Sequence, residues 1–227
     1  MSDERPVRRI GRPPLTDRAA LLAAARGIGF AELTVGSVTA AVGVKYSTFY
    51  RHFPSLDALV TALVDTVCEE ELELPPRGPA WQDTVLGTCE AVQALLDRYS
   101  GMAAAVVALP RLPARIVEIY RQLTEILTEA GFDAERAALG AVCALETVTV
   151  TELTTPGPGR SLPDRQREIE TADPPLDIGV LAATAKLVDQ PPSVWTSRKI
   201  QLLIRGLEAD LAAASAPAAA PELVSEP

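Results

Sequence analysis

Residues 33–53 read LTVGSVTAAVGVKYSTFYRHF, and they decide the fold of the N-terminal part of the chain. Val35, Val38 and Val42 recur at the spacing of one buried face of a short helix. Gly43 follows them, at the position where a helix commonly ends in a left-handed residue that glycine adopts at little cost. The stretch therefore predicts two short helices joined by a tight turn.

The second helix, expected over residues 45–52, has an apolar side and a polar side. Phe49 and Phe53 lie four residues apart and are expected to face inward, and Pro54 ends the helix. The side chains left to face outward are Lys45, Tyr46, Thr48 and Tyr50. This division is typical of a helix-turn-helix, whose second helix lies in the major groove of DNA.

The order of residues around this motif resembles a known family. Thr34, Gly43-Val44 and Tyr50-Arg51-His52-Phe53-Pro54-Ser55 follow the pattern of the DNA-binding domain of TetR-family transcription regulators. The resemblance is close over residues 12–72. From residue 81 onward the chain resembles the tetracycline-repressor type of C-terminal domain more loosely. The resemblance implies a ligand-responsive homodimer, a repressor released from a palindromic double-stranded DNA operator by a small amphiphilic effector.

Two positions depart from the pattern of that family. Gly36 stands where members often carry a basic or polar side chain, so one candidate for reading bases is missing. Leu56 stands where many members carry lysine, so one candidate phosphate contact is missing.

The predicted DNA contacts come from an N-terminal arm and from the motif. The prolines after Arg12 keep the backbone extended, so Arg12 fits a narrow minor groove; the alternative is a solvated tail. Lys45, Tyr46 and Ser47 are expected to read base edges, and the Thr48 methyl group to contact thymine. The predicted site also includes Ser37 and four expected phosphate contacts, Thr34, Tyr50, Arg51 and His52.

The charge of the chain is divided between two parts. The net charge is −9, but residues 1–53 hold eight Lys or Arg and four Asp or Glu. The first part is therefore basic and the remainder strongly acidic. Such a division steers the basic part toward phosphate groups.

The rest of the chain predicts helices, because apolar residues recur at helical spacing and no long stretch alternates with a period of two. The fold class is therefore all-α, with a three-helix head and a larger helical domain for ligand binding and dimerisation. The expected helices cover residues 16–31, 55–74, 81–98, 102–108, 113–130, 134–153, 177–188 and 194–213. The expected domain limits are 1–14 (flexible basic arm), 15–72 (head, with the motif at about 34–53), 80–213 (larger domain) and 214–227 (disordered tail).

Polar residues among apolar ones predict a pocket for the effector in the larger domain. Glu146 is the main candidate, because a carboxylate within an apolar helix requires a partner. The other candidates are Thr84, Thr88, Met102, Tyr120, Thr147 and Thr151. The alternative is that the threonines bond to their own helix backbone, and that Glu146 reaches a dimer rim or an arginine.

Two helices of the larger domain predict a dimer interface. Residues 137–150 are apolar nearly all round. A second apolar stripe consists of Ile200, Leu203, Ile204, Leu207 and Leu211. Pairing both helices with their copies in a second chain gives a four-helix interface. The alternative is an ordinary core within one chain.

Composition and motifs argue against other classes of protein. His52 is the only histidine, and neither zinc-ligand spacing nor a phosphate-binding loop occurs, so we expect no enzyme, no metal site and no cofactor. Cys68, Cys89 and Cys143 are scattered and odd in number, which favours buried reduced thiols in a cytoplasmic protein. Uncharged apolar runs are too short to span a bilayer, which excludes a membrane partner.

One alternative function stays open. The chain could be a helical interaction module that binds a protein or lipid-like partner and no longer reads DNA. The outward side chains of residues 45–51 are hydrogen-bond donors, which favours DNA.

Overall fold

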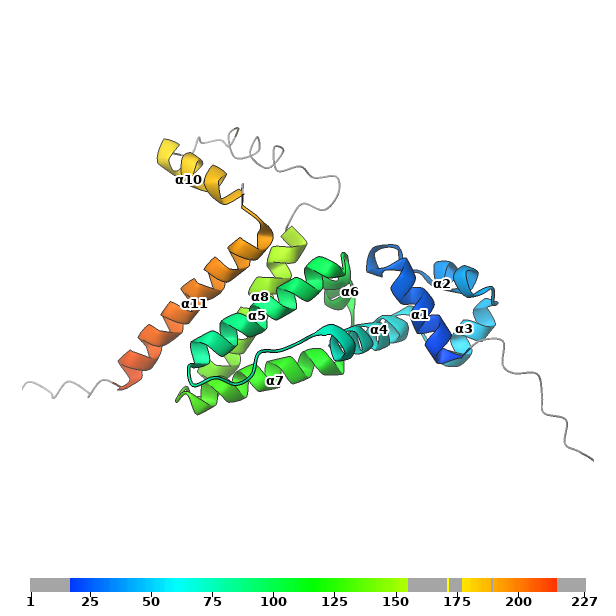
Figure 1. Cartoon of the computed structure of the whole chain (residues 1–227), viewed down its shortest axis with the longest axis horizontal. Helices are drawn as coiled ribbons and strands as arrows, with labels where there is room; N and C mark the ends of the chain where they lie inside the picture. The colour runs from blue at the N-terminus through cyan, green and yellow to red at the C-terminus, as the bar shows by residue number, and fades with distance from the viewer. Residues whose placement is uncertain (1–16, 155–170, 172–176, 189, 216–227) are drawn as a thin grey trace, which may run out of the picture. The chain divides into compact units, whose positions relative to one another are not determined.

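The computed structural model describes residues 17–154, 171, 177–188 and 190–215, and the regular secondary structure of this part of the chain is helical, without a strand (Figure 1). The all-α prediction is therefore confirmed. The described residues divide into two compact units. The first holds residues 17–67 and 99–113, and the second holds residues 68–98 and the described residues from 114 onward.

The first unit contains the predicted helix-turn-helix. Its elements are α1 (Arg18–Ile28), the 3-10 turn η1 (Phe30–Glu32), α2 (Val35–Val42), α3 (Tyr46–His52), most of α4 (Leu56–Glu71) and α6 (Met102–Ala108). Residues from α1 to α4 share one apolar core, in which α1 packs on α2 and α2 packs on α3. The buried core residues include Leu21, Ala25, Val38, Phe49, Phe53, Leu59 and Leu63.

The first helix is shorter than the sequence predicts. We expected residues 16–31 with Thr16 as the N-cap, but α1 begins at Arg18, and Thr16 lies outside the described residues. The Asp17 side chain caps the helix by accepting a hydrogen bond from the Ala20 N–H at 2.8 Å. Gly29 ends it with a φ of 83°, after which the chain turns into η1.

The second unit is built around one helix. Its elements are α5 (Trp81–Arg98), α7 (Ala114–Glu129), α8 (Ala134–Thr154), α10 (Ile178–Val188) and α11 (Pro192–Ser215). α8 packs against α5, α7 and α11 (Figure 1). A Cβ added at Gly140 would lie 2.9 Å from Leu127 Cδ1 of α7 and 3.4 Å from Leu207 of α11, so the missing side chain brings three helices together. The length and composition of α8 match those of a membrane-spanning helix, but core helices pass the same test.

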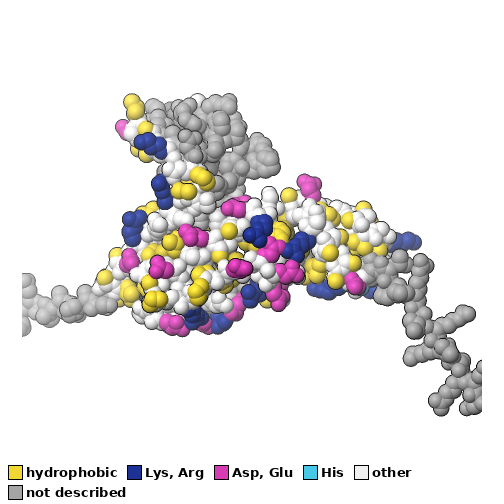
Figure 2. Space-filling model, in the orientation of Figure 1, with side chains coloured by type: hydrophobic (Ala, Val, Ile, Leu, Met, Phe, Trp, Pro, Cys, Tyr) yellow, Lys and Arg dark blue, Asp and Glu magenta, His cyan; other side chains and the backbone are white. Residues whose placement is uncertain are grey.

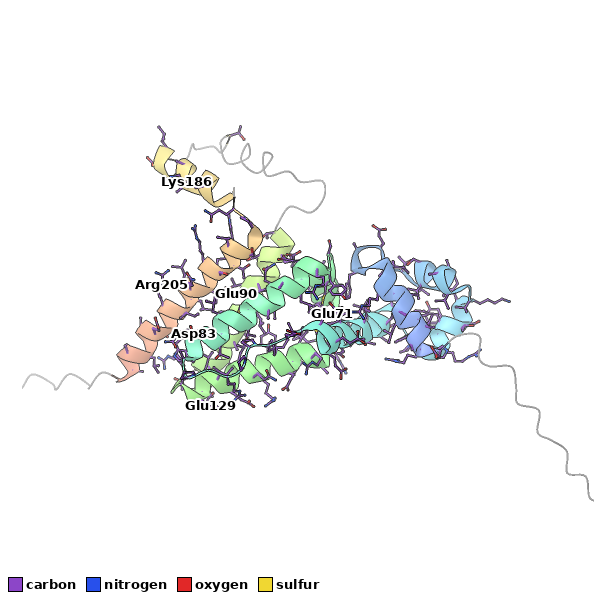
Figure 3. All side chains as sticks on the ribbon, viewed as in Figure 1. Glu71, Asp83, Glu90, Glu129, Lys186 and Arg205 are labelled. Carbon is purple, nitrogen blue, oxygen red and sulfur yellow. The ribbon has the colours of Figure 1, made fainter. Side chains whose placement is uncertain are left out.

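Ion pairs hold the segment between α4 and α5 within this unit. Arg77 pairs with Glu125 at 2.8 Å and with Glu129 at 3.0 Å, both on α7, and Arg98 of α5 pairs with Glu71 at 2.6 Å. Glu71 and Glu129 are labelled in Figure 3. These pairs are largely exposed, so each adds little to stability.

The predicted dimer stripe on α11 is a core stripe, which corrects that part of the prediction. Ile200, Ile204 and Leu207 are buried within the chain, because this side of α11 packs on α5 and α8. Residues 137–150 of α8 are buried on the side that packs within the chain, whereas Leu139 and Val150 are 61% and 51% exposed. Burial of that exposed side in a dimer stays a prediction. The alternative of an intrachain core is correct for the stripe on α11.

The turn at Gly43 makes a stability prediction. Gly43 has a φ of 72°, in the left-handed region, so Gly43→Ala is expected to lower the free energy of unfolding by about 1 kcal/mol. Gly27→Ala in α1 is the control, because a Cβ there meets nothing within 4 Å and alanine is the better helix former by about 1 kcal/mol. Urea unfolding followed by circular dichroism measures both. If Gly43→Ala and Gly27→Ala changed the free energy of unfolding by the same amount and in the same direction, the role of Gly43 in the turn would be contradicted.

Candidate DNA-binding surface

A Schellman turn sets the angle between α2 and α3. The Gly43 N–H donates to the Ala40 carbonyl at 3.2 Å, and the Val44 N–H donates to the Thr39 carbonyl at 3.0 Å. These two bonds satisfy carbonyl groups at the end of α2 and direct the chain into α3. The turn that the sequence predicts at Gly43 is therefore confirmed.

The start of α2 is closed by a capping box between two predicted DNA-binding residues. The Ser37 N–H donates to Thr34 Oγ1 at 2.9 Å, and the Thr34 N–H donates to Ser37 Oγ at 2.9 Å. Ser37 Oγ also donates to the Glu32 carbonyl at 3.1 Å. These hydrogen bonds give both hydroxyl groups a structural role. Thr34 is exposed and Ser37 is half-buried.

The inner side of α3 is anchored by two phenylalanines. Phe49 and Phe53 are fully buried, as the sequence predicts, and their ring centroids lie 5.9 Å apart. The Arg18 guanidinium of α1 lies over the Phe53 ring at 4.2 Å and donates to the His52 carbonyl at 3.3 Å. The end of α3 is thus tied to α1 through both the ring and the backbone.

The outer side of α3 presents most of the residues predicted to contact DNA. Tyr46 and Tyr50 are 56% and 52% exposed. Lys45, Ser47 and Arg51 are also exposed, whereas Thr48 and His52 are half-buried. Arg12 lies outside the described residues. Lys45 is the N-cap residue of α3 and makes no capping bond with its side chain, which leaves its ammonium group directed to solvent.

A segment far along the chain completes the first unit, and the sequence analysis did not identify it. Tyr99 Oη accepts hydrogen bonds from Arg26 Nε at 3.2 Å and Arg26 Nη2 at 3.0 Å, and the Tyr99 ring meets Phe30 edge-on at 6.2 Å. A Cβ on Gly101, whose φ is 84°, would lie 2.9 Å from the Ala31 backbone nitrogen. The start of α6 therefore packs directly against η1.

Three of the four threonines predicted to bind the effector donate hydrogen bonds to nearby backbone carbonyl groups. Thr84 and Thr88 of α5 and Thr151 of α8 are buried, and Thr147 is half-buried. Thr84, Thr147 and Thr151 donate to carbonyl groups four residues earlier, at 3.4, 2.6 and 2.6 Å. This bonding is the alternative that the sequence analysis left open.

The Glu146 side chain is exposed in the single chain, so it requires no partner there. Tyr120 of α7 is half-buried, and its pKa is raised by burial and then by the negative charge of Glu146. Met102 is buried on α6 in the first unit, whereas the other six candidates belong to the second. A role in ligand binding stays a prediction for all seven residues.

A buried polar network joins three helices of the second unit, and the sequence analysis missed it. Gln93 of α5 is 2% exposed; its amide nitrogen donates to Asp97 at 2.8 Å and to Glu152 of α8 at 3.2 Å. Thr196 of α11 donates to the Gln93 amide oxygen at 2.7 Å. A glutamine within the apolar stripe of α5 was the signal that could have revealed it.

A groove of about 480 Å³ lies beside this network, between α5 and α11. Its walls include Glu90, Asp97, Ser193 and Arg198, and Ser197 donates to Glu90 at 2.9 Å (Figure 3). None of the seven residues predicted to bind the effector lines this groove. Among the described residues, no group of three His, Cys, Asp or Glu is placed to hold a metal ion.

No disulfide joins the three cysteines, all of which lie within the described residues. Cys68 and Cys89 are buried, as expected, and Cys143 is half-buried. Burial, followed by the charge of Glu90, raises the pKa of Cys89 to about 12, so this thiol stays protonated.

The network makes a pH prediction. Burial raises the pKa of Glu152 above its ordinary value of 4.5, the Gln93 hydrogen bond lowers it in part, and Asp97 raises it. The folded chain therefore binds this proton more tightly than the unfolded chain, so the free energy of unfolding falls as the pH rises above about 4.5 through the raised pKa. Glu152→Gln is expected to reduce this decline in urea titrations at several pH values. Glu73→Gln, at an exposed carboxylate, is the control, and an unchanged decline in Glu152→Gln would contradict the prediction.

Comparisons with known proteins agree with this geometry. Residues 15–63 match the family model of the bacterial regulatory proteins of the tetR family. No curated protein matches the chain at a significant level.

Several solved structures share the fold. A possible TetR family transcriptional regulator from Streptomyces coelicolor has a TM-score of 0.72 at 22% identity, with 86% of this chain and 100% of that chain covered. ActR from Streptomyces coelicolor, in complex with (S)-DNPA, has a TM-score of 0.71 at 18% identity, with 86% and 98% covered. BioQ from Mycobacterium smegmatis has a TM-score of 0.63 at 20% identity, with 86% and 99% covered, and a further BioQ structure contains its double-stranded DNA operator. Residues 15–63 therefore match the N-terminal domain of the bacterial regulatory proteins of the tetR family, and the chain as a whole shares its fold with these solved structures.

Proposed function

We propose that this protein is a transcription regulator that binds a two-fold-symmetric DNA operator as a homodimer and is released from it by a small amphiphilic effector. The observation that carries the proposal is the outer side of α3. Exposed donors from Lys45 to Arg51 project from a helix whose inner side is fixed by Phe49 and Phe53. This geometry is that of a recognition helix.

Each exposed residue of α3 has a role that fits its chemistry. Lys45, at the start of the helix, suits guanine O6 and N7, and Tyr46 and Ser47 reach neighbouring base edges. Tyr50 and Arg51 contact phosphates and set the register of the helix on the duplex. Residues 1–53 hold eight Lys or Arg against four Asp or Glu, whereas the whole chain has a net charge of −9, which favours approach to DNA through the N-terminal part. Acidic and basic side chains both lie on the face of the second unit drawn in Figure 2.

An exposed stripe on α8 supports dimer formation. Leu139, Cys143, Glu146, Val150 and Leu153 follow each other at intervals of four, three, four and three residues. This is the spacing with which paired helices pack, and all five side chains are exposed or half-exposed in the single chain. Leu202 of α11 is also 64% exposed. The dimer face that we propose therefore consists of the α8 stripe together with the side of α11 that carries Leu202.

The effector is proposed from relatives and from the architecture of the second unit. ActR was solved in complex with a small molecule, and BioQ with its operator. In this chain the second unit is larger than the DNA-binding part, and it contains polar groups between packed helices. Binding of an effector that prefers one arrangement of these helices would lower the affinity for the operator by the same coupling energy.

Lys45 provides the test of the DNA-binding function. Lys45→Ala is expected to weaken operator binding by about 1–3 kcal/mol and to relax base preference at one position in each half-site. The operator is obtained by selecting bound sequences from a random duplex pool at low salt, and affinity is then measured by fluorescence anisotropy as salt increases. Lys186→Ala, at an exposed lysine of α10, is the control.

Recovery of an inverted repeat, with binding that weakens steeply as salt increases, would support the proposal. A protein that retains no duplex from the pool would instead be the interaction module considered as the alternative. Equal affinity and preference for Lys45→Ala and the native protein would show that α3 is placed incorrectly on the DNA.

Val150 provides the test of the dimer face. Val150→Arg introduces a charge into the α8 stripe and is expected to raise the dimer dissociation constant at least about tenfold, as measured by analytical ultracentrifugation. Val117→Arg on α7 is a matched control, because Val117 and Val150 are both 51% exposed. Equal dissociation constants for the two variants would contradict the proposed dimer face.

A further inference from the structure

Gly36 and Tyr46 form a contact that joins α2 to α3. A Cβ built on Gly36 would lie 2.9 Å from Tyr46 Oη and 3.7 Å from Thr34 Oγ1. Tyr46 is the first residue of α3 and remains 56% exposed. Its hydroxyl group therefore rests on the bare backbone of α2, while about half of the side chain faces solvent.

The space that Tyr46 occupies exists because position 36 has no side chain. A non-bonded contact of 2.9 Å is shorter than the contacts that Cβ atoms make in proteins. Any side chain at position 36 therefore displaces the Tyr46 hydroxyl group. The displaced atom is the tip of a flexible side chain, so the backbone of α2 and α3 need not move. Residue 36 thus controls the position of Tyr46 without controlling the fold.

We propose that Gly36 is a specificity-determining residue, because it leaves the space in which the hydroxyl group of the exposed Tyr46 lies against α2. This inference rests on the proposed function. The phenol group of Tyr46 suits thymine, whose major-groove edge offers a methyl group to the ring and O4 as an acceptor for the hydroxyl. Contact with α2 also restricts the Tyr46 rotamers before DNA binds, which lowers the entropy lost on binding.

Four variants test this role by selection from a random duplex pool. The native protein is expected to prefer thymine at one position in each half-site, and Tyr46→Ala to lose about tenfold of that preference. Gly36→Ala is expected to lose a similar amount, because its methyl group moves the Tyr46 hydroxyl. The double variant should behave like Tyr46→Ala alone. Gly27→Ala, where a Cβ meets nothing within 4 Å, should keep the native preference.

A measurement on the free protein separates this inference from the proposed function. Nuclear Overhauser contacts between the Gly36 α-protons and the Tyr46 ring protons are expected in the native protein, and should be retained in Gly27→Ala. Their absence would overturn the inference, whatever DNA the protein selects.

Two selection results would also overturn the inference. The first is a thymine preference in Gly36→Ala equal to that of the native protein. The second is a loss of thymine preference on Gly36→Ala that is equally large in the native protein and in Tyr46→Ala. If the native protein selects no duplex while the ring contacts are observed, the proposed function fails, and the specificity role of Gly36 fails with it.

Discussion

The orientation of α3 depends on the burial of two phenyl rings. Phe49 and Phe53 occupy the core of the first unit, so the residues between and opposite them must face outward. Gly43 supplies the left-handed turn that lets α3 leave α2 at the required angle, and Arg18 ties the far end of α3 to α1. The polar surface is therefore positioned by apolar packing and not by its own hydrogen bonds.

The second unit depends on close packing around α8. Gly140 permits the approach of α7 and α11, and the polar network around Gln93 fixes the register of α5, α8 and α11. The chain passes between the two units at three points, after Val67, after Arg98 and after Pro113. Residues 99–113, which link α5 to α7 along the chain, belong to the first unit and contact η1 there.

The sequence by itself determined the helix-turn-helix. Its signals are local: apolar residues at helical spacing, a glycine where a left-handed residue is needed, capping hydroxyls at Thr34 and Ser55, and a proline after Phe53. The inward direction of Phe49 and Phe53 follows from the same spacing, because residues four apart on a helix share a face. Most predicted helix limits lie within a few residues of the observed ones, because these signals are also local.

The tertiary structure alone decided which apolar surfaces are paired within the chain. The stripe on α11 and residues 137–150 of α8 look equally suited to a core or to a dimer, because periodicity shows that a face is apolar and not what covers it. The same limit explains why the contacts of Tyr99 with Arg26 and of Tyr46 with Gly36 were not predicted. Such contacts join side chains whose meeting depends on how whole helices pack, and this information is not carried by local spacing.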